Sequence, residues 1–259
     1  MIKEMKILII DSDPAEINER KKANFGMTTG EGYASALRAC RDDLQITIVC
    51  PYDGDPLPDP TEYEGVIFTG SAVGWSTDAP QEAPLVAAMR RCFDAKRPVM
   101  GSCNGMQLAA TVLGGSNRAS PNGSEDGLAR DIRLTEAGRT HPFLAGRQDE
   151  YAAPTVHRDE VAKLPDGAVL LATNDHSAVQ AFAYERDGIR FWGVQYHPEY
   201  TLAYIGKGMR DWNKLPKDIA ADIAIADTDR AAAARLGVRF TDMQPEMRMT
   251  ELRNWLASL

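Results

Sequence analysis

The residues with the clearest chemical potential lie in the pentapeptide G-S-C-N-G at positions 101–105. This pattern is a nucleophile elbow, G-x-S-x-G, in which a cysteine takes the nucleophile position. A short apolar run precedes it at 98–100, and a helical pattern follows it at 104–113. Such a strand-to-helix turn projects the central side chain at a helix N-terminus, where the helix dipole favours a thiolate. Cys103 is therefore predicted to be a nucleophile, and the backbone N–H of Asn104 is predicted to donate to an oxyanion.

A cysteine nucleophile needs a base, and the segment G-V-Q-Y-H-P-E at 193–199 offers one just past an expected strand. Glu199 lies two residues beyond His197, across a proline that keeps this stretch from becoming helical. The carboxylate can then reach the far ring nitrogen of His197, set its tautomer and stabilise the imidazolium. A lone histidine at a strand end is usually a surface residue. Beside an elbow cysteine at the same sheet edge, it is predicted to be a catalytic base.

The elements that must position these residues alternate between short apolar runs and helical stretches. Strands are expected at 6–10, 45–50, 65–69 and 98–100, and helices at 32–41, 80–95 and 104–113. This alternation predicts an α/β fold with a mainly parallel sheet flanked by helices. Ligands of such sheets bind outside the carboxyl ends of the strands, where Cys103 is expected to lie.

The second half of the chain has a different pattern. Strands are expected at 131–135, 169–173, 179–184 and 189–195, with a hairpin at the R-D-G tripeptide 186–188. They predict an antiparallel extension of the sheet. From about residue 201 the pattern is helical, with an apolar stripe from Leu252 to Leu259 and a second helix ended by Gly237. We therefore expect one domain over residues 1–206 and a C-terminal helical appendage over 207–259 that packs on it.

Composition limits the function classes. The 259 residues include 29 basic and 37 acidic ones, and the net charge is −8. The basic cluster R-K-K at 20–22 is expected to be a solvated helix end rather than a nucleic-acid patch. No apolar run approaches the roughly 20 residues of a membrane span, and no signal peptide is apparent. Neither nucleic acid nor a membrane is therefore predicted as a partner.

The four cysteines are too sparse for a disulfide scaffold and form no C-x-x-C pair. A cytoplasmic setting is expected, with Cys40, Cys50 and Cys92 as buried, inert thiols. No cofactor is predicted, because the chain has neither a dinucleotide fingerprint nor a P-loop. No metal is predicted either, because the spacing matches no zinc motif. The residues considered as metal ligands are His157, Asp159, Asp175 and His176. Trp75, just after a glycine turn, is expected at the mouth of a pocket.

Together these motifs resemble the class I, or triad, glutamine amidotransferases. The marks of that family occur in order over about residues 5–205: F-T-G-S at 68–71, G-S-C-N-G-M-Q at 101–107 and W-G-V-Q-Y-H-P-E at 192–199. The stretch V-H-R-D-E-V at 156–161 is similar to the S-H-x-D-x-V of the branch that includes the amidotransferase part of GMP synthase. The resemblance implies a flavodoxin-like fold.

The resemblance also implies a reaction. Cys103 would attack the side-chain amide of glutamine and form a γ-glutamyl thioester, with His197 as base and Glu199 orienting it. The backbone N–H groups of Gly70 and Asn104 would hold the oxyanion. The residues implied in substrate binding are Ser71, Gln107 and His157.

Two departures from the family pattern keep several functions open. The residue after the nucleophile is usually large, but here it is Asn104, and the glycine turn reads G-S-A at 70–72 instead of G-G-P. A glycine-serine turn resembles the free-standing branch that includes plant γ-glutamyl peptidases. The alternatives are a glutaminase that feeds ammonia to a separate synthetase chain, a free-standing γ-glutamyl peptide or amide hydrolase, and a non-catalytic interaction protein. The sequence indicates no oligomeric state.

Overall fold

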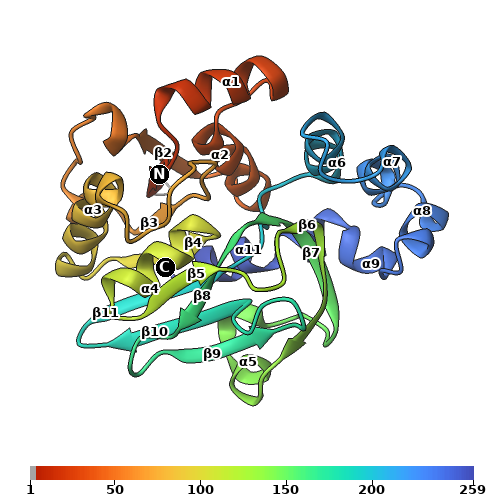
Figure 1. Cartoon of the computed structure of the whole chain (residues 1–259). Coiled ribbons are helices and arrows are strands. Elements are labelled where there is room, and N and C mark those ends of the chain that lie inside the picture. Colours follow the sequence, from red (N-terminus) through yellow and green to blue (C-terminus); the bar gives the residue numbers. More distant parts are fainter. Residues whose placement is uncertain (1–3) are drawn as a thin grey trace.

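A nine-stranded sheet runs through the computed structural model, which describes residues 4–259 (Figure 1). The strand order is β2-β1-β3-β4-β11-β10-β9-β6-β7. The parallel strands are β2 (Leu44–Val49), β1 (Met5–Ile10), β3 (Gly65–Phe68), β4 (Pro98–Ser102) and β11 (Ile189–Val194). The antiparallel extension continues from β11 with β10 (Ala181–Arg186), β9 (Val169–Thr173), β6 (Glu125–Leu134) and β7 (Tyr151–His157). The predicted fold class is therefore confirmed.

The sheet is buried on both faces because the apolar side chains of its parallel strands alternate between two cores. Ile7 and Ile9 of β1 face α2 (Thr29–Cys40) and α11 (Thr250–Ala257), whereas Leu8 and Ile10 face α3 (Ala83–Asp94) and α4 (Asn104–Val112). These four of the six β1 residues are each 0% exposed. Helices on both faces hold the strand ends, and therefore the elbow, in place.

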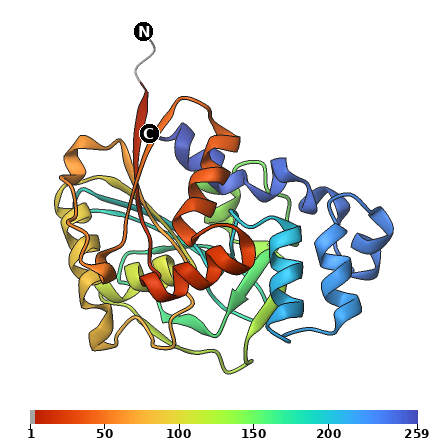
Figure 2. The same ribbon diagram turned by 90° about the horizontal axis from the view of Figure 1, so that it is seen from above.

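The other helices lie along the chain as follows: α1 (Ala15–Phe25), α5 (Glu136–Thr140), α6 (Leu202–Asp211), α7 (Lys217–Ile225), α8 (Arg230–Arg235), α9 (Phe240–Met243) and α10 (Pro245–Arg248). Figure 2 shows α6 and α7 side by side at one end of the molecule, next to the end of α1. A separate pair of strands, β5 (Ser116–Ala119) and β8 (Asp159–Lys163), lies outside the main sheet. None of the helices within residues 4–259 has both the length and the apolar character of a membrane span.

The C-terminal helix α11 packs into the same core as the N-terminal strands. The ring of Trp255, 1% exposed, covers Gly65 of β3 so closely that a Cβ there would lie 2.7 Å from it. A buried ion pair also anchors α11, because Arg147 Nε lies 2.7 Å from Glu251 Oε1 and both side chains are 0% exposed. The domain boundary at residue 206 stays a prediction, but α11 contributes directly to the main core.

Several expectations about individual elements are wrong. The strand expected at 131–135 begins at Glu125, because the charged residues of β6 hide its alternation and Asp131 forms a bulge with φ 50°. Helix α1 and strands β5, β7 and β8 were not expected. The cluster at 20–22 is not fully solvated, because Lys21 is 7% exposed and its Nζ lies 2.6 Å from a carboxylate oxygen of Asp13.

Candidate active site

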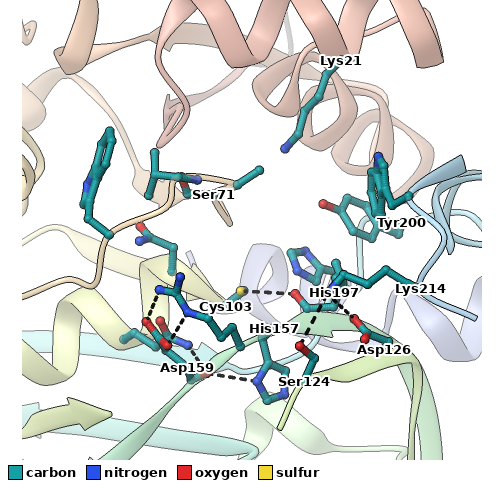
Figure 3. Close-up of a pocket in the computed structure, with 18 residues that line it drawn as sticks. Lys21, Ser71, Cys103, Ser124, Asp126, His157, Asp159, His197, Tyr200 and Lys214 are labelled. Carbon is teal, nitrogen blue, oxygen red and sulfur yellow. Dashed lines mark hydrogen bonds and ion pairs between the residues drawn. The ribbon is translucent and has the colours of Figure 1, made fainter. Parts of the chain in front are cut away.

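Cys103 occupies the sharp turn between β4 and α4. Its backbone has φ 49° and ψ −111°, a strained conformation for a residue with a side chain. The turn is held by the Cys103 N–H, which donates to Val194 O of β11 at 2.8 Å. Glycine is required at 105, because a Cβ there would lie 2.3 Å from the carbonyl oxygen of Phe68. These contacts direct the thiol, 6% exposed, into a cavity above the sheet (Figure 3).

His197 reaches the same cavity because β11 pairs with β4 in register. Gly193 lies opposite Gly101, so the segment after β11 passes beside the elbow. His197 Nδ1 lies 2.7 Å from Glu199 Oε1, and the two side chains are 2% and 1% exposed. The structure therefore brings the three residues of the expected triad together.

The charge state of His197 follows from its neighbours. Burial by itself lowers the pKa of His197, but the Glu199 carboxylate and the Cys103 thiol raise it to about 10. The Tyr200 ring stacks on His197 with centroids 4.2 Å apart and ring planes 3° apart. The other ring nitrogen, Nε2, is buried and makes no hydrogen bond within normal distance to any residue of 4–259. The imidazolium is thus held by a carboxylate on one side and left open on the other.

Two backbone N–H groups next to Cys103 are also free. Neither Gly70 N nor Asn104 N donates to any group within the described residues. Gly70 approaches the triad so closely that a Cβ would lie 2.5 Å from His197 Cε1 and 3.5 Å from Cys103 Cβ. Free N–H groups at such a position suit a developing oxyanion.

Asp13, which was not singled out in the sequence, holds the glycine turn in place. Its Oδ1 accepts from Ala72 N at 2.7 Å and from Ser71 Oγ at 3.0 Å. Its Oδ2 accepts from Lys21 Nζ and Thr29 Oγ1, each at 2.6 Å. Burial raises the pKa of Asp13, but the Lys21 ammonium outweighs it and the net pKa is lowered. The one signal in the sequence is its place just after β1, at the carboxyl edge of the sheet.

The three residues predicted to bind substrate all line the cavity, whose volume is about 350 Å³. Each also has partners within the protein. Ser71 donates to Asp13, while Gln107 Nε2 donates to Asp159 O at 2.6 Å. The His157 ring contacts Asp159 O at 3.0 Å and Glu125 Oε2 at 2.8 Å. Their contact with substrate stays a prediction.

One group within residues 4–259 has the atoms for a metal ion. It comprises Glu125, His157 and His176, whose ligand-type atoms lie within 4.8 Å of one another. The Glu125 carboxylate, however, already accepts from His157, from Asn174 Nδ2 at 2.7 Å and from Gln180 Nε2 at 2.8 Å. Hydrogen bonding accounts for this geometry.

Further cavity residues had no local signal in the sequence. They are Lys21 of α1, Tyr200, and the pair Trp212 and Lys214 from the turn between α6 and α7. Trp75 lines the cavity as expected.

The other cysteines differ from Cys103. Burial raises the pKa of Cys50 and of Cys92 to about 12. The expectation that all three are buried is wrong for Cys40, which is partly exposed because it ends α2 at the surface.

Comparison with known proteins identifies the family of this chain. The family model for glutamine amidotransferase class-I matches residues 31–211. A γ-glutamyl-L-1-hydroxyisopropylamide hydrolase from Pseudomonas sp is 30% identical over 205 residues, which are 77% of this chain and 69% of that relative. A GMP synthase from Symbiobacterium thermophilum is 35% identical over 145 residues, but these are 56% of this chain and only 26% of that protein. A solved glutamine amidotransferase from Thermotoga maritima shares the fold, with a TM-score of 0.68 at 19% identity over 98% of this chain and 97% of that one. This chain belongs to the class I glutamine amidotransferase family.

Proposed function

We propose that this protein is a free-standing hydrolase of γ-glutamyl amides in which Cys103 is the nucleophile. The observation that carries the proposal is the elbow cysteine beside a histidine whose Nδ1 lies 2.7 Å from Glu199. The free N–H groups of Gly70 and Asn104 add the second requirement of acyl transfer, a place for the oxyanion.

The reaction proceeds in two halves. First, with His197 already carrying its proton, the sulfur of Cys103 attacks the γ-carbonyl carbon as a thiolate, and the oxyanion is held by the two N–H groups. The C–N bond then breaks, and His197 gives its proton to the leaving amine. In the second half His197 takes a proton from water, the resulting hydroxide attacks the thioester, and the C–S bond breaks. One water is consumed, and glutamate and the amine are released.

Glu199 and Asp13 support the first half of the reaction, in which the thioester forms. Glu199 keeps the imidazolium stable until the amine accepts its proton, since the carboxylate raises the pKa of His197. Asp13 fixes the turn that carries Gly70, so the oxyanion site exists before substrate binds.

A substituted amide is favoured over glutamine by two observations. The Pseudomonas relative, named for hydrolysis of a substituted γ-glutamyl amide, aligns over most of both chains. The cavity of about 350 Å³ extends beyond the thiol to Trp212 and Lys214. A second candidate, a glutaminase that passes ammonia to a separate synthetase chain, is supported by the match to part of GMP synthase. A non-catalytic protein would have no chemical need for three triad residues around one cavity.

Glutamate release separates these candidates. Glutamine and γ-glutamylethylamide are incubated with the protein, with Cys103→Ala, and with Cys40→Ala as the matched control. We expect faster release from the ethylamide, none with Cys103→Ala, and an unchanged rate with Cys40→Ala. A much faster rate on glutamine favours the glutaminase. Release by Cys103→Ala at the normal rate contradicts the mechanism.

A chemical label tests the nucleophile independently. A glutamine-like diazo-ketone should modify Cys103 before the other thiols, because burial raises the pKa of Cys50 and Cys92 to about 12. Peptide mass spectrometry after limited labelling identifies the site. Preferential labelling of Cys40 contradicts the assignment.

A further inference from the structure

The cavity has two sides that differ in chemistry. Figure 3 shows Ser71 and Asp159 on one side of Cys103, and Lys21, Tyr200 and Lys214 on the other, together with His197. We name the group formed by Lys21, Tyr200, Trp212 and Lys214 the lysine wall. If the proposed function holds, the amine that leaves must lie next to His197, because that residue protonates it. Any substituent on the amine then extends toward the lysine wall.

Lys214 is the least committed of the cations that line the cavity. Arg158 is paired with the Asp159 carboxylate through two contacts of 2.8 Å, and Lys21 Nζ lies 2.6 Å from Asp13. Lys214 Nζ, in contrast, lies 3.7 Å from Asp126 and 3.5 Å from Ser124 Oγ, and its side chain is 40% exposed. Its charge is therefore available to a ligand.

The backbone and the neighbouring rings direct Lys214 toward the cavity. Asn213 has φ 52°, a left-handed conformation that ends α6 and turns the chain back. Trp212 packs on Phe25 of α1 with ring centroids 5.6 Å apart, which fixes the turn against the N-terminal half. The Lys214 N–H donates to Met209 O at 2.9 Å. The lysine is thus presented by a held turn rather than by a loose loop.

Lys21 adds a second donor to the same wall. Its ammonium carries three N–H groups, of which Asp13 and Thr29 take two. No acceptor within residues 4–259 takes the third, and Lys21 lines the cavity. Two ammonium groups, of which that of Lys214 has its carboxylate partner Asp126 only at 3.7 Å, suit an anionic substituent better than a neutral one.

We propose that the lysine wall binds a carboxylate on the leaving amine, so that the preferred substrates are γ-glutamyl amino acids. This inference rests on the proposed function and deepens it. The γ-glutamyl group lies on the Ser71 side, the scissile nitrogen next to His197, and the carboxylate of the released amino acid on Lys214. Trp212 and Tyr200 provide apolar surface for its side chain.

Two substrates that differ in one group test the proposal. γ-Glutamylglycine carries the carboxylate, and γ-glutamylglycinamide has the same shape without the charge. The native protein should hydrolyse γ-glutamylglycine with a kcat/KM about 10-fold higher, as expected for a charge-assisted hydrogen bond. Glutamine and γ-glutamylethylamide report the activity that needs no carboxylate.

Variants assign the effect to Lys214. Lys214→Met should lower kcat/KM for γ-glutamylglycine about 10-fold, mainly through KM, and leave the three neutral substrates within about two-fold. Lys214→Arg should restore the preference, which a merely structural role would not predict. The matched control Lys217→Met changes an exposed lysine at the start of α7, outside the cavity, and it should have no effect.

Each outcome is decisive. Equal rates on the glycine and glycinamide substrates in the native protein overturn the inference while leaving the proposed function intact. Equal losses on all four substrates in Lys214→Met also overturn it, because the lysine would then bind the γ-glutamyl group or support the fold. No release from any substrate overturns the proposed function and this inference together.

Discussion

The effect of the Glu199 carboxylate on the pKa of His197 can be tested by replacing Glu199 with glutamine. The exchange keeps an oxygen acceptor near Nδ1, now at 2.7 Å, but removes the carboxylate charge. Since burial lowers the pKa of His197, whereas the Glu199 carboxylate and the Cys103 thiol together raise it to about 10, we expect the pKa in Glu199→Gln to fall toward its ordinary value of 6.5. Each pKa unit corresponds to about 1.4 kcal/mol, so the effect is at most on the order of 5 kcal/mol, the value if the carboxylate alone caused the whole rise.

The same shift predicts how stability depends on pH. A raised pKa stabilises the folded state fully below the unfolded value of 6.5, and the contribution is lost as the pH rises from 6.5 to about 10. Urea unfolding should therefore show the largest difference between the native protein and Glu199→Gln near pH 6. That difference should shrink toward pH 10. At neutral pH, kcat/KM should fall about 10²–10⁴-fold, because the acid for the leaving amine is lost.

The assay is a titration of histidine ring signals by NMR, which is practical because the chain has four histidines. The control Glu185→Gln removes an exposed carboxylate 3.9 Å from His141 and should leave the His197 signal unchanged. A shift of less than about one unit at His197 in Glu199→Gln would refute the electrostatic reasoning. A stability difference that stays constant between pH 6 and 10 would refute it as well.

Three further predictions concern close contacts. Gly70→Ala places a methyl group 2.5 Å from His197 Cε1, so activity should fall at least about 100-fold while cooperative unfolding is retained. Normal activity in this variant would contradict the close contact between Gly70 and His197. Glu251→Gln leaves the buried guanidinium of Arg147 without its counter-charge, and urea unfolding should show a loss of about 3–5 kcal/mol; a loss below about 1 kcal/mol would contradict the burial. Asp13→Asn should lower kcat at least about 10-fold by loosening the glycine turn, and a change in KM alone would argue against that role.

The elbow and the H-P-E segment could be predicted because their chemistry is local. The strained turn at Cys103 needs glycine nearby, and that requirement is visible in five consecutive letters. The central strands were predicted for a similar reason, since runs such as Ile7–Ile10 are 0% exposed and carry an unbroken apolar pattern.

The missed features depend on contacts between distant segments. Strand β7 contains Pro154, which lowers its strand signal, and it is tolerated because β7 lies at the edge of the sheet. The burial of Lys21 depends on Asp13 and on the fold around both. Lys214 contacts Ser124, which lies 90 positions away in the sequence, and no local sequence pattern predicts that contact.

The place of β11 has a consequence for how the protein is made. This strand lies between β4 and β10 in the middle of the sheet, although it follows β4 by more than 80 positions in the sequence. Contacts of such high sequence separation slow folding, since a long loop must close before they form. On the ribosome the elbow cysteine therefore emerges well before its histidine. In a nascent chain, Cys103 therefore has no His197 beside it until the late strand has inserted.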